Sequence, residues 1–375
     1  MQVITGATGS LGAHVVRKLS VRPEVQKIYC LVRAGSPIEG YSRVLQSMRS
    51  RRVFDGLTDV AKQKIVALPS DLSQATLGLD ATIYSTLTSE ITDVIHCAWS
   101  VNFNMHLSSF EKDSIGGLKN LLDLCLKAQR PAPASFNFCS SISSVVGTVE
   151  DDISEALPKK LSYAQNMGYA QSKLVSEHIC MNAAQQAGIC ARVLRIGQVI
   201  GDQDHGVWNS TEAIPLMLQA ATTIGALPKL NESPLWLPVD TVAGTVTDIS
   251  LSSTAISKPD AELVFNIVSH HPFHWTKDLL PYVREAGLEF EELEQRDWIH
   301  RLRTSNPDPV ANPPIKLVDF FASKYDTDKP RRSFNWHTER AREVSNTLAD
   351  ARPLDRELVG KMIEYFRKEC WSLKN

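Results

Sequence analysis

Tyr169 and Lys173 are the pair of side chains in this sequence best suited to proton transfer. They stand four residues apart at the start of a predicted helix over residues 169–187, so both lie on one helical face. The charge of a lysine in that position can lower the pKa of the tyrosine and ready its hydroxyl for acid–base chemistry near neutral pH. The same spacing also arises by chance on surface helices, so the pair needs supporting residues nearby.

A cluster of hydroxyl groups follows a largely apolar run upstream. Residues 136–139 are Phe, Asn, Phe and Cys, and Ser140, Ser141, Ser143 and Ser144 come next. Active sites of parallel α/β sheets lie at the C-terminal ends of the strands. The run therefore predicts a strand that delivers a serine to the tyrosine, whereas a serine-rich turn is the alternative reading.

Three glycines near the start of the chain predict a nucleotide site. Gly6, Gly9 and Gly12 are spaced as G-x-x-G-x-x-G between a short apolar strand and a predicted helix over residues 12–20. Small residues let the backbone approach a pyrophosphate, and the helix N-terminus offers free N–H groups to it. A glycine-rich turn alone is a weak signal, but its place between a strand and a helix favours dinucleotide binding.

The tyrosine–lysine pair, the serine cluster and the glycine loop can act together only if the fold brings them to one edge of a sheet. The first 200 residues alternate apolar runs with helical patterns, which predicts an α/β fold with a doubly wound parallel sheet of the Rossmann type. After the strand at residues 3–4, strands are predicted at residues 27–32, 64–67, 93–96, 135–139 and 191–195. Between them, helices are predicted at residues 12–20, 115–127 and 169–187.

A second, smaller lobe is expected after the last of these strands. We assign residues 1–200 to the nucleotide-binding domain and 201–375 to a mainly helical lobe, with about residues 239–268 returning to the sheet through a strand at 262–268. Helices are predicted at residues 213–223, 275–286 and 355–371, and a proline-rich loop at 304–314.

Composition excludes several classes of protein. The chain has 375 residues, 43% hydrophobic and 22% charged, with a formal net charge of -2. That balance argues against nucleic-acid and membrane partners. No apolar run approaches the roughly 20 residues of a membrane helix, and no signal peptide is recognised. The strand before the glycine loop begins at Met1, which indicates a piece of something longer or a truncated gene product.

The cysteine and histidine patterns predict neither disulfides nor a metal site. Seven cysteines are scattered without a C-x-x-C pair, which is typical of free thiols in a reducing cytoplasm. His270, His271 and His274 lie close together, but no second ligand cluster accompanies them. We therefore expect no metal and a cytoplasmic location.

With these motifs in place, the chain resembles the extended short-chain dehydrogenases/reductases, and within them the thioester reductase domains of non-ribosomal peptide synthetases, polyketide synthases and carboxylic acid reductases. The resemblance rests on Gly6-Ala-Thr-Gly-Ser-Leu-Gly12, Leu31-Val-Arg33, Ile95-His-Cys-Ala-Trp99, Arg195-Ile-Gly-Gln198 and Trp236-Leu-Pro-Val-Asp240. Gly206-Val-Trp208-Asn209 and Ile214-Pro215 fit the fungal synthetase-like group.

The resemblance implies roles for individual residues. Tyr169 would donate a proton, Lys173 would assist it and hold the nicotinamide ribose, and Ser141 would complete the triad. Ser114 occupies the position where such reductases usually carry a proton-relaying Asn. The implied cofactor-binding residues are Thr5, Gly6, Thr8, Gly9, Ser10, Leu11, Gly12, Arg33, Arg43, Asp71, Leu72, Ala98 and Lys173.

Arg33 predicts which cofactor is used. It ends the second strand, about 24 residues after Gly9, where an acidic residue would select NAD. An arginine there can grip a 2′-phosphate through its fork of donors, and Arg43 is a second candidate. Arg49, Arg51 and Arg52 are read as a solvated helix face, and the cofactor is predicted to be NADPH.

The resemblance implies NADPH-dependent release of an acyl thioester from a phosphopantetheine carrier domain, as an aldehyde or, after a second reduction, an alcohol. The second lobe, including Trp208 and Asn209, is expected to receive the carrier, and the domain is expected to be monomeric. Three alternatives stay open: a ketone or aldehyde reductase, a sugar-nucleotide epimerase or dehydratase, and a non-enzymatic NADP-sensing regulator. The arginine at position 33 argues against the epimerase, and the intact triad argues against the regulator.

Overall fold

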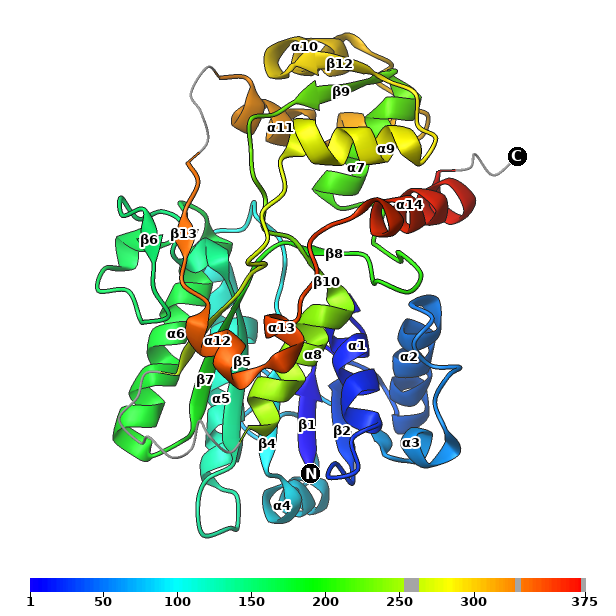
Figure 1. Ribbon diagram of the computed structural model, residues 1–375. Coiled ribbons are helices and arrows are strands. Elements are labelled where there is room, and N and C mark those ends of the chain that lie inside the picture. The colour runs from blue at the N-terminus through cyan, green and yellow to red at the C-terminus, as the bar shows by residue number, and fades with distance from the viewer. Residues whose placement is uncertain (253–262, 328–331, 372–375) are drawn as a thin grey trace. The chain divides into compact units, whose positions relative to one another are not determined.

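The computed structural model describes residues 1–252, 263–327 and 332–371 (Figure 1). The chain divides into two compact units. Unit 1 contains Met1–Val199, Val239–Val268 and Phe334–Ala351, and unit 2 contains Ile200–Pro238, Ser269–Ser333 and Arg352–Asn375.

Unit 1 is built on a seven-stranded sheet in the order β11-β7-β5-β4-β1-β2-β3, and the pairs are parallel. The strands are β1 (Gln2–Thr5), β2 (Ile28–Val32), β3 (Ile65–Pro69), β4 (Asp93–His96), β5 (Ser135–Ser141), β7 (Ala191–Ile196) and β11 (Val264–Ile267). Most of their residues are buried, as expected for a parallel sheet covered by helices. The predicted doubly wound parallel sheet is confirmed.

Helices of unit 1 alternate with these strands. They are α1 (Ser10–Ser20), α2 (Pro37–Ser50), α3 (Asp59–Gln63), α4 (Ala81–Glu90), α5 (Gly116–Leu126), α6 (Gly168–Ala187), α8 (Val239–Leu251), α12 (Glu339–Val344) and α13 (Asn346–Ala349). Side chains at their starts satisfy free backbone donors: Ser36 accepts from the Glu39 N–H and Asp80 from the Ile83 N–H. Gly188 ends α6 in the left-handed conformation, at φ 68°.

The segment Phe334–Ala351 belongs to unit 1, although the sequence analysis assigned it to the second lobe. Its strand β13 (Asn335–Trp336) pairs with β6 (Asp152–Ile153). The buried Glu155 carboxylate accepts hydrogen bonds from the backbone N–H groups of Asn266, Arg340 and Ala341, so it ties three distant parts of the chain together. A two-residue pairing and a single buried carboxylate leave no periodic signal in the sequence.

Residues 239–251 also take a form that was not anticipated in detail. The segment rejoins unit 1 as helix α8, which packs against α1 and α13, and the strand β11 follows it. Of the strand predicted at 262–268, residue 262 lies outside the described residues.

Unit 2 has its own hydrophobic core. Its helices are α7 (Ala213–Thr223), α9 (Leu280–Glu285), α10 (Gln295–Thr304), α11 (Val318–Tyr325) and α14 (Arg356–Tyr365). Strands β9 (Ala226–Lys229) and β12 (Glu291–Glu294) pair in parallel, so the lobe is not wholly helical. The short strands β8 (Val199–Ile200) and β10 (Leu237–Pro238) pair with each other, and the boundary between the two units falls within β8. The predicted helix 275–286 begins as a π-helical turn, η6 (Trp275–Leu279), before α9.

Candidate active site

At Gly6 and Gly12, the loop between β1 and the start of α1 leaves no room for a side chain. A Cβ at Gly12 would lie 2.1 Å from the Gly6 carbonyl oxygen, and one at Gly6 would lie 2.7 Å from the Ala98 nitrogen. Gly6 also has a φ of 75°, which side chains disfavour. The Gly9 N–H donates to the Gly6 carbonyl at 2.8 Å and closes the turn. This bare turn at a helix N-terminus fits a dinucleotide pyrophosphate.

Hydrogen bonds join the ends of β1 and β4 beside the loop. The Ala98 N–H donates to Thr5 Oγ1 at 3.1 Å, and Thr5 Oγ1 lies 2.7 Å from His96 Nδ1. Thr8 and Gly9 lie in the turn itself, while Ser10 and Leu11 open α1. The loop residues predicted from the sequence are therefore brought together at one edge of the sheet.

The predicted cofactor-selecting residues lie on the β2–β3 side and are exposed. Arg33 follows β2, and the Arg43 guanidinium on α2 donates a hydrogen bond to the Arg33 carbonyl oxygen. Asp71 follows β3, where hydrogen bonds from Gln74 and Ser73 hold the pKa of its carboxyl below the ordinary value. This hydrogen bond holds the Arg43 side chain beside the backbone of Arg33.

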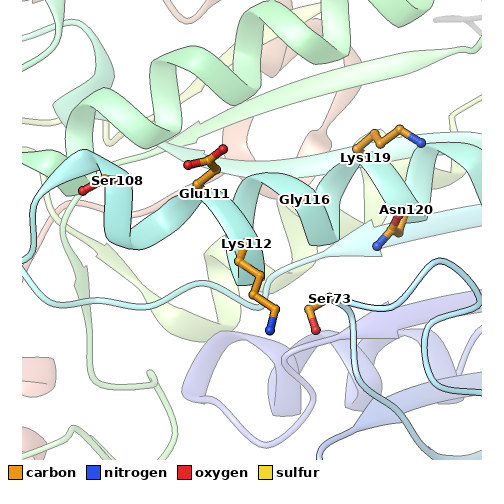
Figure 2. A pocket seen from close by; sticks show the side chains of 7 residues that line it. All are labelled: Ser73, Ser108, Glu111, Lys112, Gly116, Lys119 and Asn120. Carbon is orange, nitrogen blue, oxygen red and sulfur yellow. The ribbon is translucent and has the colours of Figure 1, made fainter.

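A pocket of about 490 Å³ borders the loop after β3 (Figure 2). Figure 2 shows Lys112 reaching toward Ser73. Asn120 on α5 donates to the Leu72 carbonyl at 2.9 Å and fixes that loop. The pocket is lined by Ser73, Ser108, Glu111, Lys112, Gly116, Lys119 and Asn120. Because Ser73 directly follows Asp71 and Leu72, two of the predicted cofactor-binding residues, the pocket adjoins that end of the site.

The predicted catalytic residues meet where β5 ends and α6 begins. Tyr169 and Lys173 lie in the first two turns of α6, and Ser141 is the last residue of β5. Burial raises the pKa of Tyr169, while a hydrogen bond with Ser141 opposes that rise. The spacing of Tyr169 and Lys173 predicted that the lysine would lower this pKa. In this structure, burial has the larger effect, and Ser141 is the group that counters it.

Lys173 is 3% exposed, and burial lowers its pKa to about 7. Its ammonium group donates to the Cys139 carbonyl at 2.7 Å. A lysine that titrates near neutral pH can change its charge as a reaction proceeds. The geometry therefore unites a hydroxyl donor, a titrating ammonium and a serine at one strand end.

A buried ion pair supports this strand end. Ser140 donates to Glu177 Oε1 at 2.5 Å, and Arg195 Nη2 lies 2.7 Å from Glu177 Oε2. The Ser140 hydroxyl is therefore bound to Glu177, whereas Ser141 hydrogen-bonds with Tyr169. The sequence offered a signal for the ion pair, because an arginine inside the apolar strand β7 requires a buried partner.

Aromatic rings that the sequence analysis did not assign surround the tyrosine. Phe103 and Phe110 meet the Tyr169 ring edge-on, at centroid distances of 5.3 and 6.5 Å. Trp99 lies under Lys173. Ser114 is buried in a π-helical turn, η2 (Glu111–Ile115), that leads into α5.

Two further expectations concern unit 2 and metals. Trp208 is buried in the core of unit 2 and donates to Glu212 at 3.0 Å, so it packs inside that unit, while Asn209 is exposed. His274 caps η6 through the Thr276 and Lys277 N–H groups. Within residues 1–252, 263–327 and 332–371, no group of three or more potential ligands could hold a metal ion. In the same ranges, no helix is both long and apolar enough to cross a membrane.

The parallel sheet and the glycine loop after β1 define a Rossmann-type dinucleotide-binding fold, and the tyrosine–lysine pair on α6 lies at the end of its sheet. The profile of the male sterility protein family, an NAD-binding domain, matches residues 4–246, more than half of the chain. The chain therefore belongs to this family of NAD(P)-binding reductase domains, and its cofactor is a nicotinamide dinucleotide.

Sequence relatives are large synthetases and reductases. The chain is 34% identical over 331 residues to the non-ribosomal peptide synthetase ascB of Acremonium egyptiacum, covering 86% of this chain and 30% of that protein. It is 32% identical over 369 residues to a carboxylic acid reductase of Neurospora crassa, covering 95% of this chain and 34% of that protein. The chain thus spans about a third of the length of these relatives.

Solved structures share the fold. The terminal R domain of the myxalamid PKS-NRPS pathway superposes with a TM-score of 0.85 at 23% identity, covering 100% of this chain and 91% of that one. A thiolation-reductase di-domain of an archaeal non-ribosomal peptide synthetase gives a TM-score of 0.75 at 20% identity, covering 98% and 75%.

Proposed function

We propose that this chain reduces an acyl thioester, held on the phosphopantetheine arm of a carrier domain, and releases it as an aldehyde. The observation that carries the proposal is the meeting of Ser141, Tyr169 and Lys173 at the end of β5, in a chain whose relatives are synthetases and carboxylic acid reductases. A reductase triad needs a carbonyl substrate, and a thioester is the carbonyl that such assemblies carry.

The chain's own residues would handle the proton. The bound nicotinamide supplies a hydride to the thioester carbonyl carbon. Ser141 stabilises the developing oxyanion, and Tyr169 protonates it. Lys173 holds positive charge near the tyrosine and favours loss of that proton. The resulting hemithioacetal collapses to an aldehyde and a free thiol, and a second reduction would give the alcohol.

NADPH is the proposed cofactor. The turn from Gly6 to Gly12 would hold the pyrophosphate, and the loop at Asp71 and Leu72 would meet the adenine. Arg33 and Arg43 present guanidinium groups on the exposed β2 side, where a 2′-phosphate would gain charge-assisted hydrogen bonds. This arrangement favours NADPH over NADH.

The proposed partner is an acyl-phosphopantetheine carrier domain. The similar archaeal structure is a thiolation-reductase di-domain, which supports a carrier beside the reductase. We propose that the domain itself is monomeric and cytoplasmic, a location with which its seven free cysteines agree. Size-exclusion chromatography checks the first of these two points.

The decisive test compares substrates. One acyl group is presented to the purified chain on a carrier domain, on a small thiol, and as the related free ketone, each with NADPH. Loss of NADPH absorbance is followed, and the aldehyde is trapped and identified. We expect the carrier-bound thioester to react fastest, because binding energy from remote parts of a substrate can orient its reacting centre.

The variant Tyr169→Phe serves as the control, since it keeps the ring and removes the proton donor. Good reduction of free ketones with no reduction of thioesters would overturn the thioester proposal and make the chain a simple carbonyl reductase.

A further inference from the structure

The Trp99 indole lies beside the triad, and the proposed chemistry gives it no role. It follows β4 by three residues, and its indole is held by two neighbouring rings. The His96 ring meets it edge-on at 5.7 Å between centroids, and the Phe138 ring lies 5.3 Å away. Because both neighbours are buried in adjacent strands, the indole is fixed in position.

The Lys173 ammonium group lies over this ring. Its Nζ is 4.2 Å from the Trp99 centroid and 4.6 Å from the Phe138 centroid. Indole is the strongest of the natural rings in attracting a cation, and the attraction grows when water is excluded. Contact with the indole face therefore replaces part of the hydration that the ammonium group loses on burial.

The N–H edge of the Trp99 indole is linked through Ser172 to the backbone of Tyr169. Its Nε1–H donates to Ser172 Oγ at 3.1 Å, and Ser172 Oγ donates to the Tyr169 carbonyl at 2.7 Å. A single indole thus contacts the lysine by its face and the first turn of α6 by its edge. One ring from the segment after β4 therefore contacts both the lysine and the turn that carries the tyrosine.

We propose that Trp99 is a positioning residue for the Tyr169–Lys173 pair: its face binds the Lys173 ammonium ion, and its N–H fixes the first turn of α6 through Ser172. The assignment rests on the proposed function only for the roles of the tyrosine and the lysine. The residue acts through these two side chains and needs no contact with the substrate.

Several other titratable groups face Lys173 and must be separated from its titration. They are Cys97 beyond β4, Cys139 on β5, His96 on β4, and Tyr169, Glu177 and Cys180 on α6. Burial, with the nearby lysine charge, lowers the pKa of His96 to about 3. Glu177 is bound by Arg195. The histidine therefore stays uncharged through the neutral range, and the lysine is expected to titrate there.

A fluorescence titration tests the contact without cofactor or substrate. Emission of Trp99 is isolated by subtracting the spectrum of Trp99→Phe from that of the wild type, which removes the other six tryptophans. The difference is recorded from about pH 5 to pH 10, a range that spans ordinary and lowered lysine pKa values. We expect a step near pH 7 as the ammonium over the indole loses its proton.

The matched control repeats the subtraction in a Lys173→Met background. The step should vanish there, because no ammonium remains over the ring. Absence of the step in the wild-type background, or its persistence in Lys173→Met, would overturn the proposal.

Activity variants give a second readout. Trp99→Leu keeps apolar bulk but removes the indole face, so the lysine should lose its proton more easily. We expect the alkaline limb of the kcat–pH profile to move to lower pH by about 0.5–1 unit, with a smaller shift in Trp99→Phe. Ser172→Ala removes only the hydrogen bond and should lower kcat a few-fold with the limb in place. An unmoved limb in Trp99→Leu would reduce Trp99 to a packing residue.

The two tests separate failure of this inference from failure of the proposed function. A lysine-dependent emission step in a chain that reduces no thioester would reject the substrate assignment and leave the role of Trp99 intact. Thioester reduction by a chain whose emission step persists in Lys173→Met would do the reverse.

Discussion

The two ends of the candidate site in unit 1 are built differently. At the β5–α6 end, Lys173 is buried and Tyr169 is partly buried, both contact aromatic rings, and Lys173 also donates to the Cys139 carbonyl. At the β2–β3 end, Arg33, Arg43 and Asp71 are exposed. One end holds its groups by packing, and the other presents them to solvent.

This contrast separates chemistry from recognition. Buried groups are held in place and have shifted pKa values, which proton transfer requires. Exposed guanidinium groups interact through charge that salt can screen, and this suffices to choose between two dinucleotides. Each end should therefore respond to a different perturbation, and the variants below test that expectation.

Tyr169→Phe should have the largest effect on turnover. General acid catalysis contributes about 100- to 10,000-fold, so kcat should fall on that scale. The ring contacts with Phe103 and Phe110 remain, so NADPH affinity, measured by cofactor fluorescence, should be nearly unchanged. Near wild-type turnover would assign the proton to another acid.

Glu177→Ala should cause the largest loss of stability. Removing one partner of a buried ion pair costs about 3–5 kcal/mol, because Arg195 would be left charged and unpaired. Urea denaturation measures the change. Asp123→Ala, which breaks the exposed pair with Lys119, is the control and should cost about 0–1 kcal/mol. Equal losses in the two variants would remove the distinction between buried and exposed pairs.

Arg33→Ala should weaken NADPH binding by about 10- to 100-fold, since a charge-assisted contact is worth about 1.5–3 kcal/mol. NADH affinity should stay constant, and the preference of the wild type should shrink as salt is added. Arg49→Ala on the same side of the sheet is the control, because Arg49 pairs with Asp55 and stacks on Phe54. Wild-type affinities that are equal for both cofactors would contradict the NADPH assignment.

Lys173→Met should give the smallest predicted change in free energy, a gain in unfolding free energy of about 1 kcal/mol at neutral pH. Burial lowers the lysine pKa from 10.5 to about 7, so the unfolded chain binds the proton more tightly. Wild-type stability is therefore lost as the pH falls from about 10.5 toward 7, and the variant lacks this loss. Unfolding by urea at pH 9.5 and pH 7 measures the difference, and a variant less stable than the wild type at pH 7 would contradict it.

The sheet and the glycine loop could be predicted because their signals are local. A continuous apolar run marks β2, largely apolar runs mark β5 and β7, and backbone crowding at Gly6 and Gly12 demands glycine. The positions of Tyr169 and Lys173 followed from helical spacing. The roles predicted for these residues and for the cofactor-binding residues stay predictions.

Other features depend on tertiary contacts that no short window contains. Trp99 was quoted as part of a motif, but its position under Lys173 arises only when the segment after β4 packs against α6. The same holds for Glu177, which lies in a helix of weak amphipathic pattern and finds Arg195 across the sheet. Trp208 was expected to receive a carrier, yet the unit 2 core encloses it.

The discontinuous composition of unit 1 affects how the chain is made. Strand β7 ends at Ile196, but its outer neighbour β11 starts only at Val264, and two of the partners of Glu155, Arg340 and Ala341, come after residue 333. At a synthesis rate of about 5–20 residues per second, the edge of β7 waits several seconds for its neighbour on the ribosome. Unpaired strand edges promote association between chains. Nascent unit 1 therefore passes through an aggregation-sensitive interval that ends when β11 and α12 have been synthesised.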